Sequence, residues 1–139
     1  MTALQAGEAL GPDTFRITRA DLVRYAGASG DFNPIHWSDR VATSVGLPGV
    51  IAHGMYTMAL AGRAVSAWIE PDHELASFAV RFSKPVVVPD DDTGVVLEVS
   101  GVAKEPDDQG RVRIDLTVTS DGVKVLGMAR AFVAARADG

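Results

Sequence analysis

The chain has 139 residues, the length of one globular domain with a substantial apolar core, so we expect a single domain over residues 1–139. Apolar residues make up 47% and charged residues 22%, with the two signs interleaved to a net charge of −5, which excludes a disordered chain and a basic nucleic-acid-binding face. There is no cysteine, and the three histidines lack the spacing of a helical metal site, so we expect no disulfide, metal ion or cofactor.

The N-terminal segment has no sign of a targeting signal. Residues 1–11 lack the basic region and the apolar run of a secretory signal. The longest apolar run, over residues 55–69, is shorter than the ~20 residues that span a bilayer, and Arg63 interrupts it. We therefore expect a cytoplasmic enzyme or binding module without a membrane partner.

The first elements of the chain are short and clearly bounded. Alternation over residues 14–17 predicts a strand, and residues 18–21 have the pattern of a capping box that opens a helix. We expect this helix to stop at Gly27 or Gly30. Residues 38–45 predict a second short helix.

Residues 54–69 predict the longest helix of the chain. Apolar side chains occupy almost every side of it, so a helix of about 24 Å, at 1.5 Å per residue, must be covered nearly all round. Arg63 is the exception and needs solvent, a partner subunit or a carboxylate. Pro71 ends the helix.

The remainder of the chain has the two-residue period of strands. We expect four strands, over residues 77–88, 94–104, 111–120 and 123–136. Asp121-Gly122 is a strongly preferred hairpin turn. An antiparallel sheet with one long apolar helix laid on it, of class α+β, is the simplest architecture.

The loop between the first two helices places a carboxylate near an imidazole, in the segment Asp31-Phe32-Asn33-Pro34-Ile35-His36. Pro34 fixes its own φ and keeps Asn33 out of the α region, so Asp31 and His36 have a defined relative geometry. The pair could hold one water between them for acid–base chemistry. The spacing also leaves open an ordinary Asx turn beside a partly buried His36.

Residues 25–36 resemble the signature of the MaoC-like (R)-specific enoyl hydratase and dehydratase family, in the order Tyr25-Ala26-Gly27-Ala28-Ser29-Gly30-Asp31-Phe32-Asn33-Pro34-Ile35-His36. The similarity continues through residues 50–55, Arg81-Phe82, Pro85 and the last strands. Within the family, Asn-Pro-Ile-His-Trp and Ile-Ala-His-Gly-Met are most similar to the B-type subunits of mycobacterial (3R)-hydroxyacyl-acyl-carrier-protein dehydratases.

This resemblance implies a hot-dog fold, in which the sheet wraps around the helix over residues 54–69. It also implies two subunits side by side, so we expect a homodimer or a heterodimer with a second hot-dog subunit. The implied reaction is the reversible syn addition of water to a trans-2-enoyl thioester of coenzyme A or an acyl carrier protein, giving the (3R)-hydroxyacyl product in fatty-acid metabolism. Asp31 and His36 fall on the catalytic positions of the family.

Gly54 is a third candidate for a catalytic role. Charge that develops on the thioester oxygen needs fixed donors, and a backbone N–H at a helix N-terminus is suited to this because the helix dipole favours negative charge there. Without a Cβ, Gly54 would let the acyl carbonyl approach closely. The alternative is a glycine that permits close packing where the helix starts.

Six further residues are candidates for substrate contacts, namely Asn33, His53, Met55, Met58, Arg81 and Lys84. The methionines would line the acyl tail. The two cations would meet the phosphates of coenzyme A or of a phosphopantetheine group, unless they are solvated strand charges. His53 fits a capping or packing residue better than a catalyst, and the Asn33 amide would organise the loop or orient substrate.

Two other functions compete with the hydratase interpretation. One is a non-catalytic hot-dog module that binds acyl thioesters or supports a catalytic partner. The other is a hot-dog thioesterase. The presence of both Asp31 and His36 disfavours the first, and the acid-x-Asn-Pro-x-His pattern favours the hydratase branch over the second.

Overall fold

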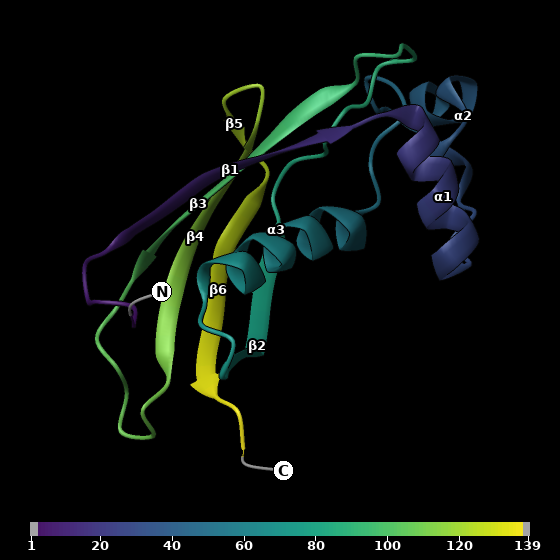
Figure 1. The fold of residues 1–139 in the computed structure, drawn as a ribbon. Coiled ribbons are helices and arrows are strands. Elements are labelled where there is room, and N and C mark those ends of the chain that lie inside the picture. Colours follow the sequence, from purple (N-terminus) through teal and green to yellow (C-terminus); the bar gives the residue numbers. More distant parts are fainter. Residues whose placement is uncertain (1–2, 138–139) are drawn as a thin grey trace.

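A computed structural model describes residues 3–137 and has one antiparallel sheet that curves around one long helix (Figure 1). In chain order the elements are β1 (Ala9–Ile17), α1 (Arg19–Ser29), the 3₁₀ helix η1 (Pro34–His36), α2 (Asp39–Ser44), α3 (Gly54–Trp68), β2 (His73–Phe82), β3 (Val95–Ala103), β4 (Val112–Ser120), β5 (Val123–Lys124) and β6 (Leu126–Ala135). The strand order is β1-β3-β4-β6-β2, and β5 pairs with β4. This architecture confirms the expected α+β class. Within the described residues, no helix combines the length and the apolar character needed to cross a membrane.

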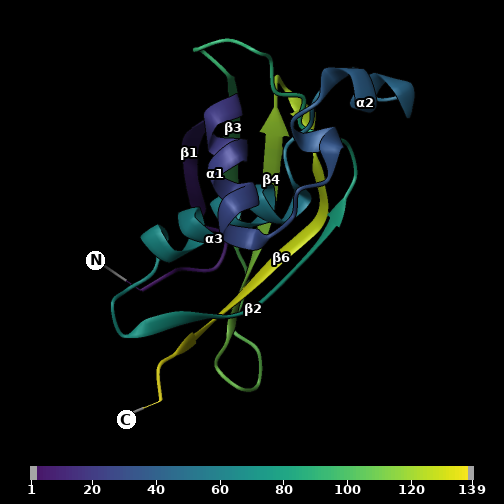
Figure 2. The same ribbon diagram turned by 90° about the vertical axis from the view of Figure 1, so that its right-hand side faces the viewer.

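The helices α1 and α2 both lie beyond the N-terminal end of α3 (Figure 1), and the turned view separates them (Figure 2). The core lies between α3 and the concave face of the sheet, where the inward-facing residues of the central strands β3 and β4 are fully buried, including Leu97, Val99, Ile114 and Val118. Their α3 partners in this core are mostly small, as at Ala61 and Ala64. Small side chains let the helix approach the sheet closely.

The capping box at the start of α1 is confirmed. The Asp21 carboxylate accepts a hydrogen bond from Thr18 N–H at 2.8 Å, and the Thr18 hydroxyl accepts one from Asp21 N–H. The helix passes through Gly27 and ends at Gly30, whose φ of 76° lies in the left-handed region that glycine adopts without strain. This sharp end sends the chain directly into the loop that begins with Asp31.

The strand expected over residues 77–88 is wrong at both ends, because β2 runs from His73 to Phe82. After Phe82, the N–H groups of Ser83 and Lys84 both donate to the carbonyl of Val125, and Pro85 has no N–H to continue a ladder. The chain therefore leaves the sheet at this point. Pro85 accordingly lies in the connection that follows the strand.

Residues 86–88 pair with residues 50–52 instead of with the sheet. Ala52 N–H donates to the Val86 carbonyl and Val88 N–H donates to the Val50 carbonyl, each at 2.9 Å. We call this pairing the backbone bridge, residues 50–52 with residues 86–88. It connects the segment before α3 to the segment after β2.

The last expected strand, over residues 123–136, is interrupted at Val125 and forms β5 and β6. Val125 N–H donates to the Val118 carbonyl of β4, whereas its own carbonyl receives the bonds of the segment after β2. Val125 thus connects β4 to the segment that follows β2. Beyond it, β6 pairs with both β4 and β2.

The expectation that α3 is covered nearly all round is wrong for the single chain. One face packs on the sheet, but Met55 is 57% exposed, and Ala59 and Arg63 follow it at intervals of four residues along the exposed side. Arg63 therefore reaches solvent, and its guanidinium lies 5.8 Å from the centre of the Phe15 ring. The apolar residues of this exposed stripe remain available to a partner.

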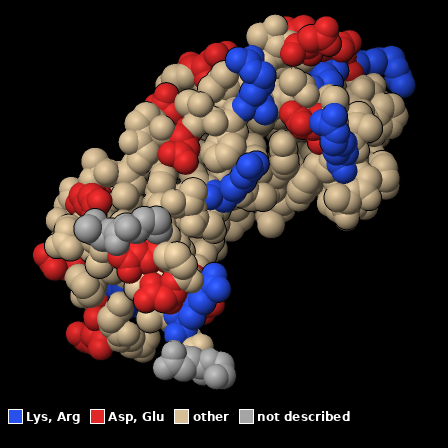
Figure 3. Space-filling view, viewed as in Figure 1, with Lys and Arg blue, Asp and Glu red and all other residues tan. Residues whose placement is uncertain are grey.

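Acidic and basic side chains are interspersed over the face drawn in Figure 3. Elsewhere in the described residues, opposite charges also pair locally, as in Arg24 with Asp21 at 3.0 Å and Arg111 with Asp107 at 2.9 Å. The charges at the surface therefore do not form one large field of a single sign on this face.

Candidate active site

The loop after α1 fixes Asp31 through hydrogen bonds within the loop itself. Asp31 N–H donates to the Ser29 hydroxyl at 3.1 Å, and Asp31 Oδ1 accepts from Asn33 N–H at 3.1 Å. Asn33 Oδ1 in turn accepts from Ile35 N–H at 3.2 Å, which caps η1. The carboxylate of Asp31 keeps its second oxygen, Oδ2, free of these local bonds.

His36 lies at the end of η1 with its ring turned inward, 8% exposed, whereas the Asp31 side chain is 51% exposed. Its Nδ1 lies 2.7 Å from the carbonyl oxygen of Ile51. Because a carbonyl can only accept, Nδ1 carries the hydrogen, and Nε2 of the neutral ring has a free lone pair. That Nε2 faces Asp31 Oδ2 at 3.8 Å.

His53 completes the polar group from the other side. Its ring stacks on that of His36, with centroids 3.8 Å apart and planes inclined by 22°, and its Nε2 lies 3.1 Å from the Asp31 carbonyl oxygen. The edge of Tyr25 also contacts it, at 4.7 Å between centroids. Burial lowers the pKa of His53, and this outweighs the bond to the Asp31 carbonyl, which acts in the opposite direction.

Ligand atoms of Asp31, His36 and His53 lie within 4.8 Å of one another, so these are the side chains here that could hold a metal ion. The two nearly parallel rings do not converge on one point, which is a poor fit to the tetrahedral geometry that zinc prefers. The arrangement suits a shared proton or water better than a metal.

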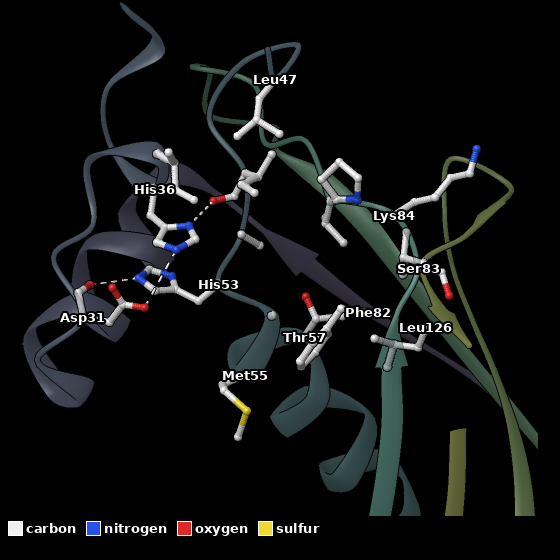
Figure 4. A pocket seen from close by; sticks show the side chains of 17 residues that line it. Asp31, His36, Leu47, His53, Met55, Thr57, Phe82, Ser83, Lys84 and Leu126 are labelled. Carbon is white, nitrogen blue, oxygen red and sulfur yellow. Dashed lines mark hydrogen bonds and ion pairs between the residues drawn. The ribbon is translucent and has the colours of Figure 1, made fainter. Parts of the chain in front are cut away.

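These polar groups lie on one side of a pocket of about 490 Å³, a volume typical of small-molecule sites (Figure 4). The remaining wall is mostly apolar. It is formed by side chains from the segment before α3, the first turn of α3, the segment after β2 and the start of β6, including Leu47, Ile51, Ala52, Thr57, Phe82, Pro85, Val86, Val125 and Leu126. The pocket can therefore hold an apolar chain beside a carboxylate and an imidazole.

Gly54 begins α3 at the edge of this pocket, and the ring of Phe82 occupies the space of its missing side chain. A Cβ at Gly54 would lie 2.9 Å from the Phe82 ring. A side chain at position 54 would therefore require the Phe82 ring to move, and the catalytic role of Gly54 remains a prediction. Its backbone still serves the site, because the N–H groups of Gly54 and Met55 make no hydrogen bond within residues 3–137 and both residues line the pocket.

The structure brings five of the expected site residues together around the pocket besides Gly54, namely Asp31, His36, His53, Met55 and Lys84. Among the residues described, the pocket wall does not include Asn33, Met58 or Arg81. Asn33 holds the loop, and Arg81 is an exposed residue of β2 opposite Gly127. Their expected contacts with substrate remain predictions.

The sequence interpretation missed three contributors to the site. Thr57 is a buried hydroxyl residue in the pocket wall, and a lone threonine one turn after His53 in an apolar helix could have indicated it. Phe82 covers Gly54, and Ile51 orients His36 through its carbonyl. A backbone acceptor has no signature in residue type, so Ile51 could not have been found.

An ion pair between Arg19 and Asp39 connects α1 and α2 near the backbone bridge. Asp39 Oδ1 accepts from Arg19 at 2.9 Å and from Val50 N–H at 3.0 Å, and Arg19 Nε donates to the Val88 carbonyl at 2.6 Å. The Val50 N–H and the Arg19 guanidinium lower the pKa of Asp39. This ion pair connects α1 and α2 to both sides of the backbone bridge.

Comparison with known proteins gives consistent matches. The family model described as "MaoC like domain" matches residues 3–122. The 3-hydroxyacyl-thioester dehydratase X of Mycobacterium tuberculosis is 49% identical over 77 residues, which are 53% of this chain and 25% of that protein. The chain thus spans about a quarter of the length of that relative.

Two solved structures superpose on nearly the whole chain. A "MaoC-like dehydratase" is 38% identical with a TM-score of 0.88, over 96% of this chain and 41% of the other. The R-hydratase PhaJ1 from Pseudomonas aeruginosa is 28% identical with a TM-score of 0.80, over 97% of this chain and 84% of the other.

Proposed function

Because the chain belongs to the MaoC-like domain family and has its hot-dog fold, we propose that it catalyses the reversible hydration of a trans-2-enoyl thioester to a (3R)-hydroxyacyl thioester. The observation that carries this proposal is the pair formed by Asp31 Oδ2 and His36 Nε2, 3.8 Å apart at the wall of an apolar pocket. A hydro-lyase needs one group to take a proton and one to give it. The relatives named for dehydratase and hydratase activity support the same reaction.

A single water fits the chemistry of this pair. With Nδ1 of His36 protonated and Asp31 ionised, the facing atoms are both acceptors, and a water can donate one hydrogen to each. In the hydration direction the water oxygen bonds to C3 of the enoyl group while the pair takes its proton. The pair then delivers a proton to C2 from the same side, so the addition is syn and the pair regains its starting state.

The thioester oxygen gains negative charge when C3 is attacked. The N–H groups of Gly54 and Met55 are suited to stabilise it, because they lie at the positive end of the dipole of a 15-residue helix and border the same pocket. Donors held in place by a packed helix need no rearrangement during the reaction. We assign the Gly54 N–H as the principal donor.

The pocket also indicates how the substrate lies. The acyl tail would follow the apolar wall formed by Leu47, Val86 and Leu126, and Lys84 at the rim would face the phosphates of coenzyme A or of a carrier's phosphopantetheine. Arg81 lies outside the pocket wall on the same segment of chain and would act only on more distant phosphates.

A dimer is part of this proposal. The strand β2 forms an edge of the sheet, and long unpaired edges are rare in natural proteins. Two exposed apolar side chains, Met55 and Phe82, line the pocket, and Phe32 is exposed in the loop next to Asp31. We propose a homodimer as the default, and a heterodimer with a second hot-dog subunit as the alternative.

Mixing the protein with crotonyl-CoA tests the reaction directly. Hydration removes the conjugated enoyl chromophore, so the ultraviolet absorbance should fall, and chiral analysis should find the (3R)-hydroxyacyl product. Release of free thiol with no hydrated product would indicate a thioesterase. Binding of the thioester without any turnover would indicate a non-catalytic module, and either result would overturn the proposal.

A further inference from the structure

We infer that His53 is a positioning residue that holds Asp31 opposite His36. The inference rests on the proposed function, because it concerns how the acid–base pair keeps its geometry. It assigns to His53 a task different from contact with substrate. The task follows from how the loop over residues 31–36 is attached to the segment before α3.

Three hydrogen bonds make this attachment. Ile51 N–H donates to the Ile35 carbonyl at 3.1 Å, His36 Nδ1–H donates to the Ile51 carbonyl at 2.7 Å, and His53 Nε2 lies 3.1 Å from the Asp31 carbonyl. The first two bonds hold the His36 end of the loop. Of these three bonds, the third is the one that reaches Asp31, whose other bonds go to Ser29 at the end of α1 and to Asn33 in the same loop.

The protonation state of His53 follows from its partners. The Asp31 carbonyl can only accept, so Nε2 carries the hydrogen and Nδ1 has the lone pair. Nδ1 is buried and has no hydrogen-bond partner within residues 3–137. Protonating it would bury a charged N–H without an acceptor, so His53 stays neutral as a donor to Asp31.

A neutral ring at this position also tolerates a charged neighbour. His36 must gain a proton during any cycle in which it acts as base, and a second cation stacked at 3.8 Å would oppose this. The other titratable groups around His53 are Asp31 on the loop, Tyr25 on α1, Tyr56 on α3 and Lys84 across the pocket. Of these, Asp31 is the one that the His53 ring bonds directly.

Simple capping does not account for His53. It occupies the N-cap position of α3, but its side chain makes no capping hydrogen bond. Packing alone would require only a flat ring between Tyr25 and His36. A positioning role additionally requires the Nε2–H, and two substitutions separate these requirements.

The experiment compares His53→Phe with His53→Gln, using crotonyl-CoA. Phenylalanine keeps a flat ring and removes the donor, whereas glutamine removes the ring and keeps an N–H donor at about the same distance along the side chain. We expect His53→Phe to lower kcat about 10- to 100-fold with KM within about threefold, because a small displacement of a reacting group has an effect of this size. His53→Gln should retain most of kcat. His73→Phe, at a half-buried histidine at the far end of β2 that does not line the pocket, is the matched control and should behave as wild type.

Two further measurements need no substrate. Nitrogen NMR of the wild-type protein should find His53 as the Nε2–H tautomer, titrating below the ordinary histidine pKa because the ring is buried. Amide hydrogen exchange over residues 31–33 should be faster in His53→Phe than in His53→Gln, while exchange in β4 stays unchanged in both.

The outcomes separate this inference from the proposed function. An Nδ1–H tautomer in the wild type, or equal kcat and equal loop exchange in the two variants, would overturn the positioning role. If His53→Phe fails to fold, the wild-type tautomer and the kcat of His53→Gln still test whether His53 has the positioning role. A wild-type protein that does not hydrate crotonyl-CoA would overturn the proposed function, whereas the tautomer and the exchange rates would still test the attachment of Asp31.

Discussion

The two ends of α3 are built in opposite ways. At its start, two backbone N–H groups and the polar group of Asp31, His36 and His53 border a pocket. At its end, Trp68 donates from Nε1 to Asp13 Oδ1 at 3.0 Å. A Cβ on the neighbouring Gly11 or Gly101 would come within about 3 Å of the Trp68 ring, at 3.0 and 3.2 Å.

This difference indicates how one helix serves two purposes. At the C-terminal end of α3, around Trp68, close packing fixes the helix on the sheet, and we call this the sealed end. At the N-terminal end, around Gly54, backbone donors are free to bind a ligand, and we call this the open end. Substitutions at the open end should therefore change activity more than stability, and substitutions at the sealed end should do the reverse.

The largest effect is expected at the open end, from the acid–base pair. Asp31→Asn and His36→Ala should each lower kcat by about 10²- to 10⁴-fold, the usual contribution of a positioned acid or base. The double variant should be little worse than the poorer single variant, because the two groups act on one water. Hydration rates measured on variants with wild-type circular dichroism check this. A folded double variant within about tenfold of wild type would contradict the assignment.

Glycine-to-alanine substitutions at the two ends give a direct contrast. The new Cβ of Gly101→Ala would lie 2.8 Å from Ile114 Cγ2 in the packed core, so we expect about 1–3 kcal/mol of destabilisation with unchanged kcat. The new Cβ of Gly54→Ala meets the half-exposed Phe82 ring, which can rotate away. This variant should lose little stability but have a raised KM for crotonyl-CoA. Denaturant titration and steady-state kinetics on both variants measure these effects. An equal loss of stability in the two variants would contradict the prediction.

The hydrogen bond at the sealed end should have a smaller effect. Trp68→Phe keeps an aromatic ring against Gly101 but removes the donor to Asp13, so we expect a loss of about 1 kcal/mol in the free energy of unfolding. Asp13→Asn retains an acceptor and should lose less. The kcat of both variants should equal that of wild type, and a changed kcat would show that the two ends are coupled.

The smallest effect is expected from pH, through Asp39 beside the open end. Because the Val50 N–H and Arg19 lower its pKa in the folded protein, Asp39 contributes stability above its unfolded pKa of about 3.9. That contribution disappears as the pH falls through the folded pKa. Asp39→Asn should therefore be slightly less stable than wild type at pH 7, and the difference should disappear once the pH lies below the folded pKa of Asp39. Parallel unfolding curves at all pH values would contradict this.

The sequence predicted the elements whose pattern is local. The capping box of α1, the alternation of β4, the start of α3 at Gly54 and the loop with Asp31 and His36 each depend on neighbouring residues, and the structure has all of them. The family resemblance supplied the topology, which periodicity alone could not give.

The rest depended on contacts between distant segments. The end of β2 at Phe82 is set by bonds to Val125, about forty residues away, and the apolar composition of α3 did not reveal that Met55 and Ala59 remain exposed in a single chain. Within the site, the sequence predicted Gly54 at the start of the helix, but it could not predict that the Phe82 ring packs against this glycine. Such pairings arise only when the chain folds.

The backbone bridge between residues 50–52 and 86–88 has a practical consequence for engineering. Its bonds join main-chain groups, so they do not depend on which side chains the bridge carries. Leu47, Pro85 and Val86 line the pocket in and beside this bridge, whereas His36 bonds only to a main-chain group of the bridge, the carbonyl of Ile51. A library that varies these three side chains can therefore reshape the pocket wall while the main-chain bond to His36 is kept, which makes this region the natural starting point for altering the proposed preference among acyl thioesters.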